Sequence, residues 1–592
     1  MNELKGLYQQ KITANSHNIH TIKNKLLVVS ISRLCAFILI GFSIYQLLIH
    51  FQLIWLFTLM GSIIGFLALI SSFIQLKNKE KYLIQLSIVY QNEIGCLNGN
   101  LNMFNNGSEF ASAESFWDDL DIFQQGGLFH LINRSSTQYG LNELAKKLQN
   151  PLLNKAEIIE EQIAIQTLSK QIPLVETIIT TSLLHKTDYT SLDAIFVWLN
   201  SANQLHKSAW VKFIRYAFPM MNIGLLCYAM VTGNISFFGI SFLMGFLQIG
   251  YYFKYLQENF GLLNNKQAIL KQYAAILKLF SKIEALDSTV LHIHKENANQ
   301  ACTAILALSK IASRIDQRLN ILIMTFFNPY FLYDIQNMWA LEDWKIKYQH
   351  DLHKWMDTVA AIERYNSLAV YAYQYSENIY PNVLEKELAI QAKGVAHPLI
   401  KKQNRVPNDI FIGHTEKLLL ITGSNMSGKT TFLRTLGVNL VMAQNGLPVC
   451  ATAFSFLPMN IFTSIRISDS LQENTSYFMA ELKKLQALKN GVKESSASLV
   501  LIDEILRGTN SDDKYYGSEQ FVKELIQFNC ISLFATHDLK LSELETEYPY
   551  QIANYCFESS IVNEKLLFDY IIRKGVAQNK NASFLMKQMG II

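Results

Sequence analysis

Residues Leu418–Leu436 read LLLITGSNMSGKTTFLRTL. The apolar run at the start predicts a buried strand, and the residues after Lys429 have the pattern of a helix. Between them lies a G-x-x-x-x-G-K-T loop. Gly423 and Gly428 would let backbone N–H groups turn toward a β-phosphate at the helix N-terminus, which favours anions. This order of strand, loop and helix predicts a nucleotide-binding α/β domain.

The loop supplies most of the expected nucleotide site. Lys429 would reach the β- and γ-phosphates of ATP, and the Thr430 hydroxyl would bind Mg²⁺. The alternative is a Gly/Ser-rich turn that contains Lys-Thr by chance. The predicted nucleotide-binding residues are Gly423, Ser424, Asn425, Met426, Ser427, Gly428, Lys429, Thr430 and Thr431.

Two further strands end in polar residues. Leu499–Glu504 reads LVLIDE, and a third apolar run, Ile531–Ala535, is followed by Thr-His-Asp. Parallel sheets place ligands at the carboxyl ends of their strands. We therefore expect Asp503 to join the Mg²⁺ shell, Glu504 to orient or deprotonate the attacking water, and His537 to sense the γ-phosphate. The alternatives are solvated acids and a structural histidine. Together the three strand ends predict an ATP hydrolase.

Several stretches resemble the MutS family of DNA mismatch repair proteins. They are Asn425-Met426, SYFMAE (476–481), DEILRGTN (503–510), Ala535-Thr536-His537, HPLI (397–400) and LFHLINRSST (128–137). The resemblance covers roughly residues 120–200 and 390–592, and it is stronger in the second region.

The resemblance implies an ATPase that works as a homodimer through its ATPase domains. Ser476 is at the position of the signature serine, which faces the γ-phosphate bound by the other subunit. As an alternative or in addition, Ser476 could cap the following helix. Arg507, Gly508 and Thr509 would form the dimer-facing loop that couples hydrolysis to movement.

The sequence also departs from the family pattern. Leu506 and Ser427 stand where mismatch-repair members have glycine. Arg405 lies near the position of an aromatic residue that stacks on adenine, and its guanidinium plane could take that role. We expect no mismatch-reading domain, because an apolar block occupies much of the chain before residue 120.

Two long blocks carry no Asp, Glu, Lys or Arg. Leu34–Leu76 is a block of 43 residues, and Tyr216–Phe253 is a block of 38. A bilayer span takes about 20 residues, so each block could form two spans. The alternative is a pair of helices buried in a soluble core, but such helices usually have a polar face. We expect hinges near residues 50–52 and 232–234.

Basic residues flank both blocks: Lys23, Lys25, Arg33, Lys77, Lys79, Lys81, Lys207, Lys212, Arg215 and Lys254. By the positive-inside rule, all four flanks are cytoplasmic. This predicts a multi-pass protein of the cell membrane whose ATPase domain is cytoplasmic. A shorter apolar stretch, residues 319–333, is expected to be a buried or interfacial helix rather than a span.

The predicted fold is an α/β P-loop ATPase domain of the ABC/MutS-like type, C-terminal to a mainly α-helical core with two transmembrane helical hairpins. The expected parts are an N-terminal cytoplasmic segment (1–25), hairpin 1 (26–76), a helical MutS-core-like region (77–210), hairpin 2 (211–256), a helical core or lever (257–385) and the ATPase domain (386–592).

Two functions remain open at this stage. One is a DNA-associated ATPase, related to mismatch repair proteins, that does not itself read mismatches. The other is an ATP-driven switch that acts on a membrane or protein partner without DNA. The net charge of +4 gives no strong nucleic-acid footprint, and seven scattered cysteines indicate neither a metal site nor a disulfide framework. A transporter of the ABC type is a weaker third idea, because the Leu-Ser-Gly-Gly-Gln signature is missing.

Overall fold

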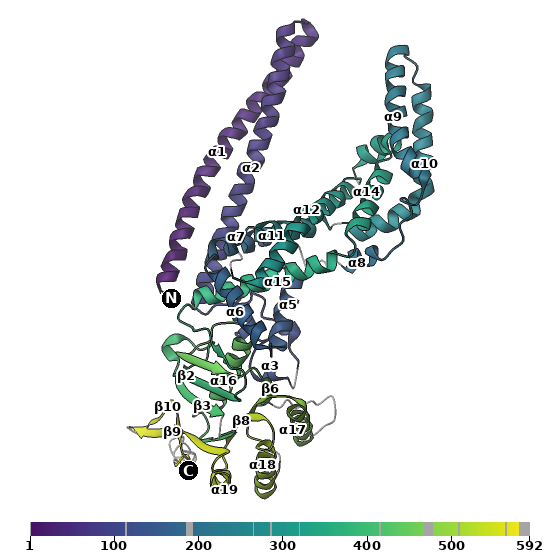
Figure 1. Ribbon diagram of the computed structural model, residues 1–592. Coiled ribbons are helices and arrows are strands. Elements are labelled where there is room, and N and C mark those ends of the chain that lie inside the picture. The colour runs from purple at the N-terminus through teal and green to yellow at the C-terminus, as the bar shows by residue number, and fades with distance from the viewer. Residues whose placement is uncertain are drawn as a thin grey trace.

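The computed structural model describes residues 2–112, 115–184, 193–264, 266–284, 287–318, 320–413, 416–466, 477–506, 509–562 and 565–578. Its N-terminal part is helical, and its C-terminal part combines helices with two β-sheets (Figure 1). Two pairs of long helices project from the same side of the body, away from the sheets (Figure 1).

The first pair is formed by α1 (Asn2–Ile49) and α2 (Leu53–Leu97), joined by a turn at residues 50–52. Near the N-terminus the pair is packed: Tyr8 stacks on Tyr90 with 5.5 Å between ring centroids. Lys11 Nζ lies 2.9 Å from Glu176 Oε2 on α7 (Ile172–Leu184), so α1 is also held to the helical body. The apolar block occupies the projecting part of the pair.

The second pair is formed by α9 (Ala209–Thr232) and α10 (Ser236–Leu263). The turn between them uses Gly233, whose φ of +73° lies in the left-handed region that glycine enters without strain. In the most apolar 18-residue stretch of each of α1, α2, α9 and α10, only 6% to 17% of the residues are buried. By length and composition, these are four helices that could cross a membrane.

Further helices build the body between and below the two pairs. They are α3 (Phe116–Asp119), α4 (Leu128–Ile132), α5 (Gln138–Gln149), α6 (Lys155–Ser169), α8 (Asp193–Leu199), α11 (Gln267–Phe280), α12 (Thr289–Gln317), α13 (Asn328–Phe331), α14 (Tyr333–Tyr348) and α15 (Leu352–Gln374).

Helix α15 is the centre of this body, and nearly all of its residues are buried. Its Glu363 carboxylate accepts hydrogen bonds from Ser136 Oγ and from Thr137 Oγ1, both at 2.6 Å. Thr137 in turn caps α5. A buried carboxylate needs such donors to offset its desolvation. The segment around residues 128–137 is therefore fixed to the centre of the helical body.

The C-terminal part has two sheets. The smaller one has the order β1-β5-β2-β3, and the larger one the order β10-β9-β4-β8-β7-β6. In the larger sheet, only β10 runs antiparallel to its neighbour. The strands are β1 (Asn382–Val383), β2 (Ala389–Val395), β3 (Asn408–Gly413), β4 (Leu418–Gly423), β5 (Ala453–Phe456), β6 (Asn460–Ser464), β7 (Ser498–Asp503), β8 (Cys530–Thr536), β9 (Ile552–Val562) and β10 (Lys565–Lys574).

Helices cover both faces of the larger sheet. Leu419 and Ile421 of β4 belong to the same buried cluster as Leu433 of α16 (Lys429–Gln444). Leu418 and Leu420 point to the other face, where they belong to the cluster of α17 (Tyr477–Glu494) and α18 (Ser511–Leu525). A short helix, α19 (Leu544–Glu547), precedes β9. Because both faces are covered, the central strands β4, β7 and β8 are buried along their whole length and mainly apolar.

Candidate functional site

The loop between β4 and α16 begins and ends with glycines in unusual conformations. The φ angles of Gly423 and Gly428 are +155° and +109°. A Cβ atom on Gly423 would lie 2.8 Å from Phe557 O, and one on Gly428 would lie 3.1 Å from the Tyr570 ring. Gly428 precedes Lys429, the first residue of α16, and caps it without a side chain. The loop therefore leaves the N-terminus of α16 open toward the cavity.

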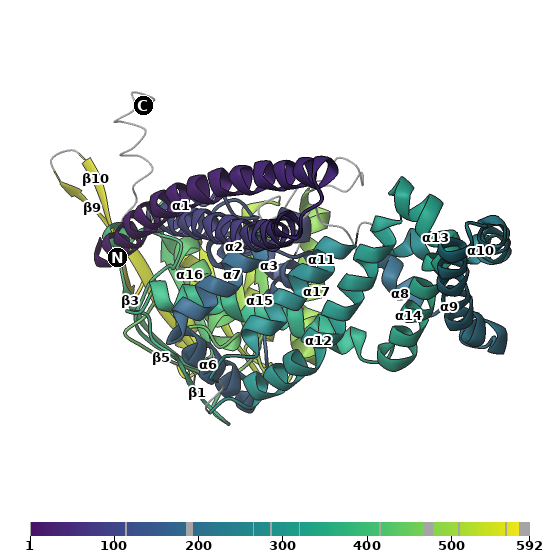
Figure 2. The same ribbon diagram turned by 90° about the horizontal axis from the view of Figure 1, so that it is seen from above.

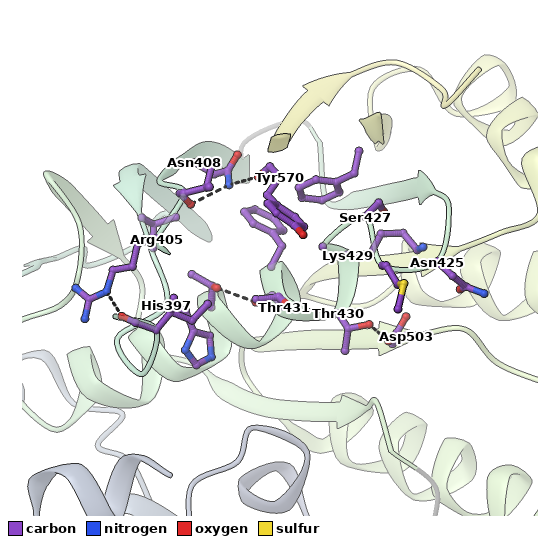
Figure 3. Close-up of a pocket in the computed structure, with 18 of the residues that line it drawn as sticks. His397, Arg405, Asn408, Asn425, Ser427, Lys429, Thr430, Thr431, Asp503 and Tyr570 are labelled. Carbon is purple, nitrogen blue, oxygen red and sulfur yellow. Dashed lines mark hydrogen bonds between the residues drawn. The ribbon is translucent and has the colours of Figure 1, made fainter. Parts of the chain in front are cut away.

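Two side chains at the start of α16 face the sheet. Lys429 Nζ donates hydrogen bonds to Gly423 O at 2.9 Å and to Ser424 O at 3.0 Å. Thr430 Oγ1 donates to Asp503 Oδ2, at the end of β7, at 2.5 Å (Figure 3). An ammonium group, a hydroxyl and a carboxylate are thus fixed beside the loop.

The neighbouring strand ends add a second carboxylate and an imidazole. Glu504 has a φ of +57°, and its N–H donates to Ala535 O at 2.9 Å, next to the end of β8. Lys514 Nζ on α18 lies 2.5 Å from Glu504 Oε1. His537 Nε2 lies 3.4 Å from Lys429 Nζ. Burial lowers the pKa of His537, and the charge of Lys429 lowers that pKa further.

One buried hydroxyl in the loop has no partner. Ser427 is 1% exposed, and its Oγ makes no hydrogen bond within the part of the chain that the structure describes. An unsatisfied buried hydroxyl costs free energy unless a ligand or water meets it. This orphaned group, the open helix N-terminus and the Thr430–Asp503 pair together fit a phosphate group with Mg²⁺.

These groups line a cavity of about 700 Å³. Its opposite wall contains Asn408 of β3 and Tyr570 of β10 (Figure 3). Asn408 Nδ2 donates to Tyr570 O at 3.0 Å, and Ile572 N–H donates to Asn408 Oδ1 at 2.8 Å. The two bonds hold an irregular part of β10 against the loop. The Tyr570 ring is thereby presented to the cavity.

Arg405 lines the cavity, and its stacking on a base stays a prediction. Its Nε donates to Ile400 O at 2.5 Å, and its Nη2 donates to Pro398 O at 2.7 Å. The guanidinium is therefore turned onto the backbone and away from Tyr570 and Lys429 (Figure 3). Carbonyl acceptors hold a fixed cation more strongly than an open cavity does. The aromatic rings that line the cavity are those of Tyr570, Phe432 and Phe557.

The dimer-related residues are only partly described. Ser476, Arg507 and Gly508 lie outside the described residues, whereas Thr509 is a partly exposed residue just before α18. Leu506 has a φ of +58°, a conformation that glycine adopts more easily. Its N–H donates to Oε1 of the buried Glu481 at 2.6 Å. The stretches 476–481 and 503–510 are therefore joined by a buried hydrogen bond.

Two functional candidates were not predicted from the sequence. Tyr570 and Lys514 come from β10 and α18, and no motif around them indicates a role at the cavity. Asn408 of β3 belongs to Pro407-Asn408-Asp409, which resembles the segment that leads into the loop in the MutS family. Lys514 is ten residues from Glu504 in the sequence, but the fold brings their charged groups together. The charge itself was the only signal that could have singled out Lys514.

Comparison with known proteins assigns the C-terminal region. Residues 419–588 match MutS domain V. The DNA mismatch repair protein MutS of Thermotoga petrophila is 34% identical over 249 residues, which cover 41% of this chain and 30% of that protein. The human MutS protein homolog 4 is 33% identical over 242 residues, which cover 39% of this chain and 25% of that protein. The chain thus spans less than a third of the length of these relatives.

The matched residues include the loop, the two carboxylates, the histidine and Tyr570. This C-terminal region is thus similar to MutS domain V and to proteins of the MutS family.

Proposed function

We propose that this protein is a membrane-anchored ATPase of the MutS type, which binds and hydrolyses ATP in a homodimer. The main support is the convergence of Lys429, Thr430, Asp503, Glu504 and His537 on one loop at the carboxyl end of a mostly parallel sheet. Structural ion pairs alone would not require the orphaned Ser427 hydroxyl or the two left-handed glycines.

The residues fit ATP with Mg²⁺. When bound, the metal would neutralise phosphate charge as it develops during hydrolysis. Thr430 and Asp503 would hold it, while Lys429 would exchange its carbonyl contacts for β- and γ-phosphate oxygens. Loop N–H groups from Ser424 to Gly428 and the Ser427 hydroxyl would bind the remaining oxygens.

The water-activating role falls to Glu504. In this structure its carboxylate is paired with Lys514, 2.5 Å away. To orient or deprotonate a water, an oxygen of Glu504 must face the phosphate rather than the ammonium. His537, held neutral by its lowered pKa, can meet a γ-phosphate oxygen or the water without adding charge beforehand. Release of Glu504 from Lys514 is therefore part of reaching the active geometry.

Tyr570 is the best candidate to contact the base of ATP. We expect Tyr570→Ala to weaken ATP binding roughly tenfold, because stacking of a base on an aromatic ring contributes on the order of 1–3 kcal/mol. Tyr570→Phe should bind ATP like the original protein, since it keeps the ring at the same positive φ. Titration with a fluorescent ATP analogue measures both. If Tyr570→Ala and Tyr570→Phe bind ATP with equal affinity, Tyr570 does not contact the base.

The pH dependence should report His537. Because its folded-state pKa lies below the usual value near 6.5, the ring is neutral at pH 7 and takes up a proton only in more acidic solution. We expect kcat/KM to hold constant as pH falls to about 6.5 and to decline below that value, since kcat/KM follows the free enzyme.

His537→Gln is the control variant for this pH profile. It should lower kcat/KM and flatten the acidic decline. A decline that is unchanged in His537→Gln would assign the titration to another group.

The dimer rests on the family assignment and on the Leu506–Glu481 hydrogen bond. Through this bond, a change around Glu504 reaches α17, the helix that follows Ser476. We propose that Ser476 contacts the γ-phosphate held by the partner and that Arg507, Gly508 and Thr509 transmit closure. Hydrolysis and dimer closure would then be coupled.

Membrane anchoring rests on the exposed apolar surface of the two helix pairs. Leu48 and Phe51 at the first turn are 82% and 76% exposed, and Val231 at the second is 86% exposed. Surfaces of this extent are rarely left in water. Both pairs project from one side of the body, so a single membrane plane can hold both (Figure 1). The ATPase domain would then lie in the cytoplasm, at the cell membrane.

The relatives' names favour a role associated with DNA, related to mismatch repair but without mismatch reading. The alternative is an ATP-driven switch that acts on a membrane or protein partner, and the position of the apolar helices supports it. The apolar helices form the ends of the two helical arms that extend from the ATPase domain (Figure 1). A movement of the ATPase domain would therefore be passed along the arms to the membrane.

DNA binding separates these two functions. If DNA is the partner, the full chain in detergent should bind a labelled duplex with an affinity that falls steeply with added salt. If no DNA binding is found at low salt, with or without ATP, the function that acts on a membrane or protein partner is favoured.

A further inference from the structure

The segment between α12 and α14 exposes a dense set of apolar side chains. Residues 319–333 contain no Asp, Glu, Lys or Arg. The described part begins at residue 320. It contains a turn of π-helix, Ile323–Phe327, and continues into α13, which ends where Leu332 takes a φ of +51°. Five side chains are more than half exposed: Ile321, Leu322, Met324, Phe326 and Phe327. The segment is therefore not part of the buried core.

The segment is docked on both helices of the second pair. Asn222 of α9 is 1% exposed, and its Nδ2 donates to Tyr330 O at 2.9 Å. The Tyr330 ring stacks on Phe238 of α10 with 4.2 Å between centroids. A Cβ on Gly245 would lie 1.8 Å from Pro329 O, so only glycine permits this approach. The broken helix thus places its backbone against protein.

Its depth follows from the basic flanks of α9 and α10. Asn222 is seven residues from Arg215, and Gly245 is nine from Lys254. At 1.5 Å per residue, the docking points lie roughly 10–14 Å inside the charge-free block. In a hydrocarbon core of about 30 Å, this is between a third and half of the way across. The neighbourhood of α13, α9 and α10 is also evident in Figure 2.

Charged groups mark the ends of the segment. The Arg318 Nε atom lies 3.4 Å from Asp334 Oδ2, which also accepts from Asn328 Nδ2 at 3.0 Å. The Arg215 guanidinium lies 4.2 Å from the Trp339 ring centroid. Charged side chains are costly inside a hydrocarbon core, so these residues are expected at its boundary. The apolar residues 319–333 lie between Arg318 and Asp334 in the sequence.

We propose that residues 320–331 form a re-entrant segment that enters the cytoplasmic leaflet beside α9 and α10 and returns, with its exposed side chains in contact with lipid acyl chains. Broken helices are tolerated at membrane depth only where protein meets their backbone groups, as Asn222 does here. The surface is continuous with exposed apolar side chains of the helix pair, such as Met220 and Leu247. The inference rests on the proposed membrane anchoring and adds a third inserted element.

Collision measurements on a spin label test this. The full chain would carry Ser at the more accessible Cys35, Cys227 and Cys302, because the other four cysteines are buried. Single cysteines would then be labelled with a nitroxide at Phe327 or, as a second variant, at Met324. The protein would be placed in phosphatidylcholine vesicles.

Two reference sites make the result decisive. Leu243→Cys lies eleven residues from Lys254, near the middle of the proposed membrane span of α10, and Lys347→Cys lies on the exposed part of α14. The ratio of oxygen to nickel-chelate collisions rises with depth in the bilayer. We expect the ratio at Phe327 and Met324 to lie above that at Lys347 and below that at Leu243, because the segment is inserted only part of the way.

The other outcomes overturn the inference in distinguishable ways. If the ratios at Phe327 and Met324 equal the ratio at Lys347 while Leu243 is exposed to lipid, the re-entrant segment is refuted. The proposed membrane anchoring by the helix pairs would still stand. Low collision rates with both reagents would mean that protein covers the segment. A Leu243 label that meets the nickel chelate as often as Lys347 would refute membrane anchoring itself.

Discussion

Glu504→Gln will lower the rate of ATP hydrolysis on the order of 10²–10³-fold and leave ATP binding in place, because general-base catalysis contributes about that much. The amide has nearly the shape of the carboxylate but cannot take a proton from water. The variant should therefore accumulate in the ATP-bound state. Steady-state phosphate release and equilibrium ATP binding measure the two effects separately.

Two further variants bracket this result. Lys429→Ala should abolish measurable nucleotide binding, because it removes the counter-charge of the β- and γ-phosphates. Glu524→Gln is the matched control: it makes the same change on an exposed part of α18, where Glu524 pairs with Lys489. It should hydrolyse ATP at the original rate.

The oligomeric state of Glu504→Gln tests the proposed dimer. Light scattering of the detergent-solubilised variant with ATP should give twice the protein mass found for Lys429→Ala. Hydrolysis by Glu504→Gln at the original rate would refute the catalytic assignment. Reduced hydrolysis by a variant that stays monomeric with ATP would instead refute the shared site.

The loop could be predicted from the sequence because strand, turn and helix are contiguous there. The cluster at the strand ends was also predictable, since parallel strands place Asp503, Glu504 and His537 at one edge. Tyr570 was not, because it lies about 140 residues after the loop, on an irregular strand fixed by Asn408. The hold of backbone carbonyls on the Arg405 guanidinium was not predictable either, because spacing does not show which acceptors a side chain finds in the fold.

The helix pairs illustrate the same limit. Uncharged blocks and their turns can be read from composition, and the structure has turns at residues 50–52 and 233–235. Composition could not show that α1 begins at Asn2 and that α2 continues to Leu97. Those polar extensions exist because Tyr8, Tyr90 and Lys11 meet partners that are distant in sequence. Similarly, the position of residues 320–331 depends on Asn222 and Gly245.

Both helix pairs should be integral to the membrane, with their turns outside the cell. In the Cys35, Cys227 and Cys302→Ser background, cysteines at Gln52 and Asn234 should react with an impermeant maleimide on intact cells. A cysteine at Gln204 should react only after lysis. Asn234 is used rather than Gly233, because the positive φ of Gly233 disfavours a side chain.

The physical reason is the cost of water around the apolar blocks. Burying apolar surface contributes about 25 cal/mol per Å², and the described residues of one chain leave these side chains of α1, α2, α9 and α10 exposed. Lysines and arginines on every flank oppose transfer of those ends across the membrane. The protein should accordingly stay with membranes in alkaline carbonate. Labelling at Gln204 but not at Asn234 in intact cells would show that the orientation is the opposite one. Release of the protein by carbonate would show that another protein surface covers these helices.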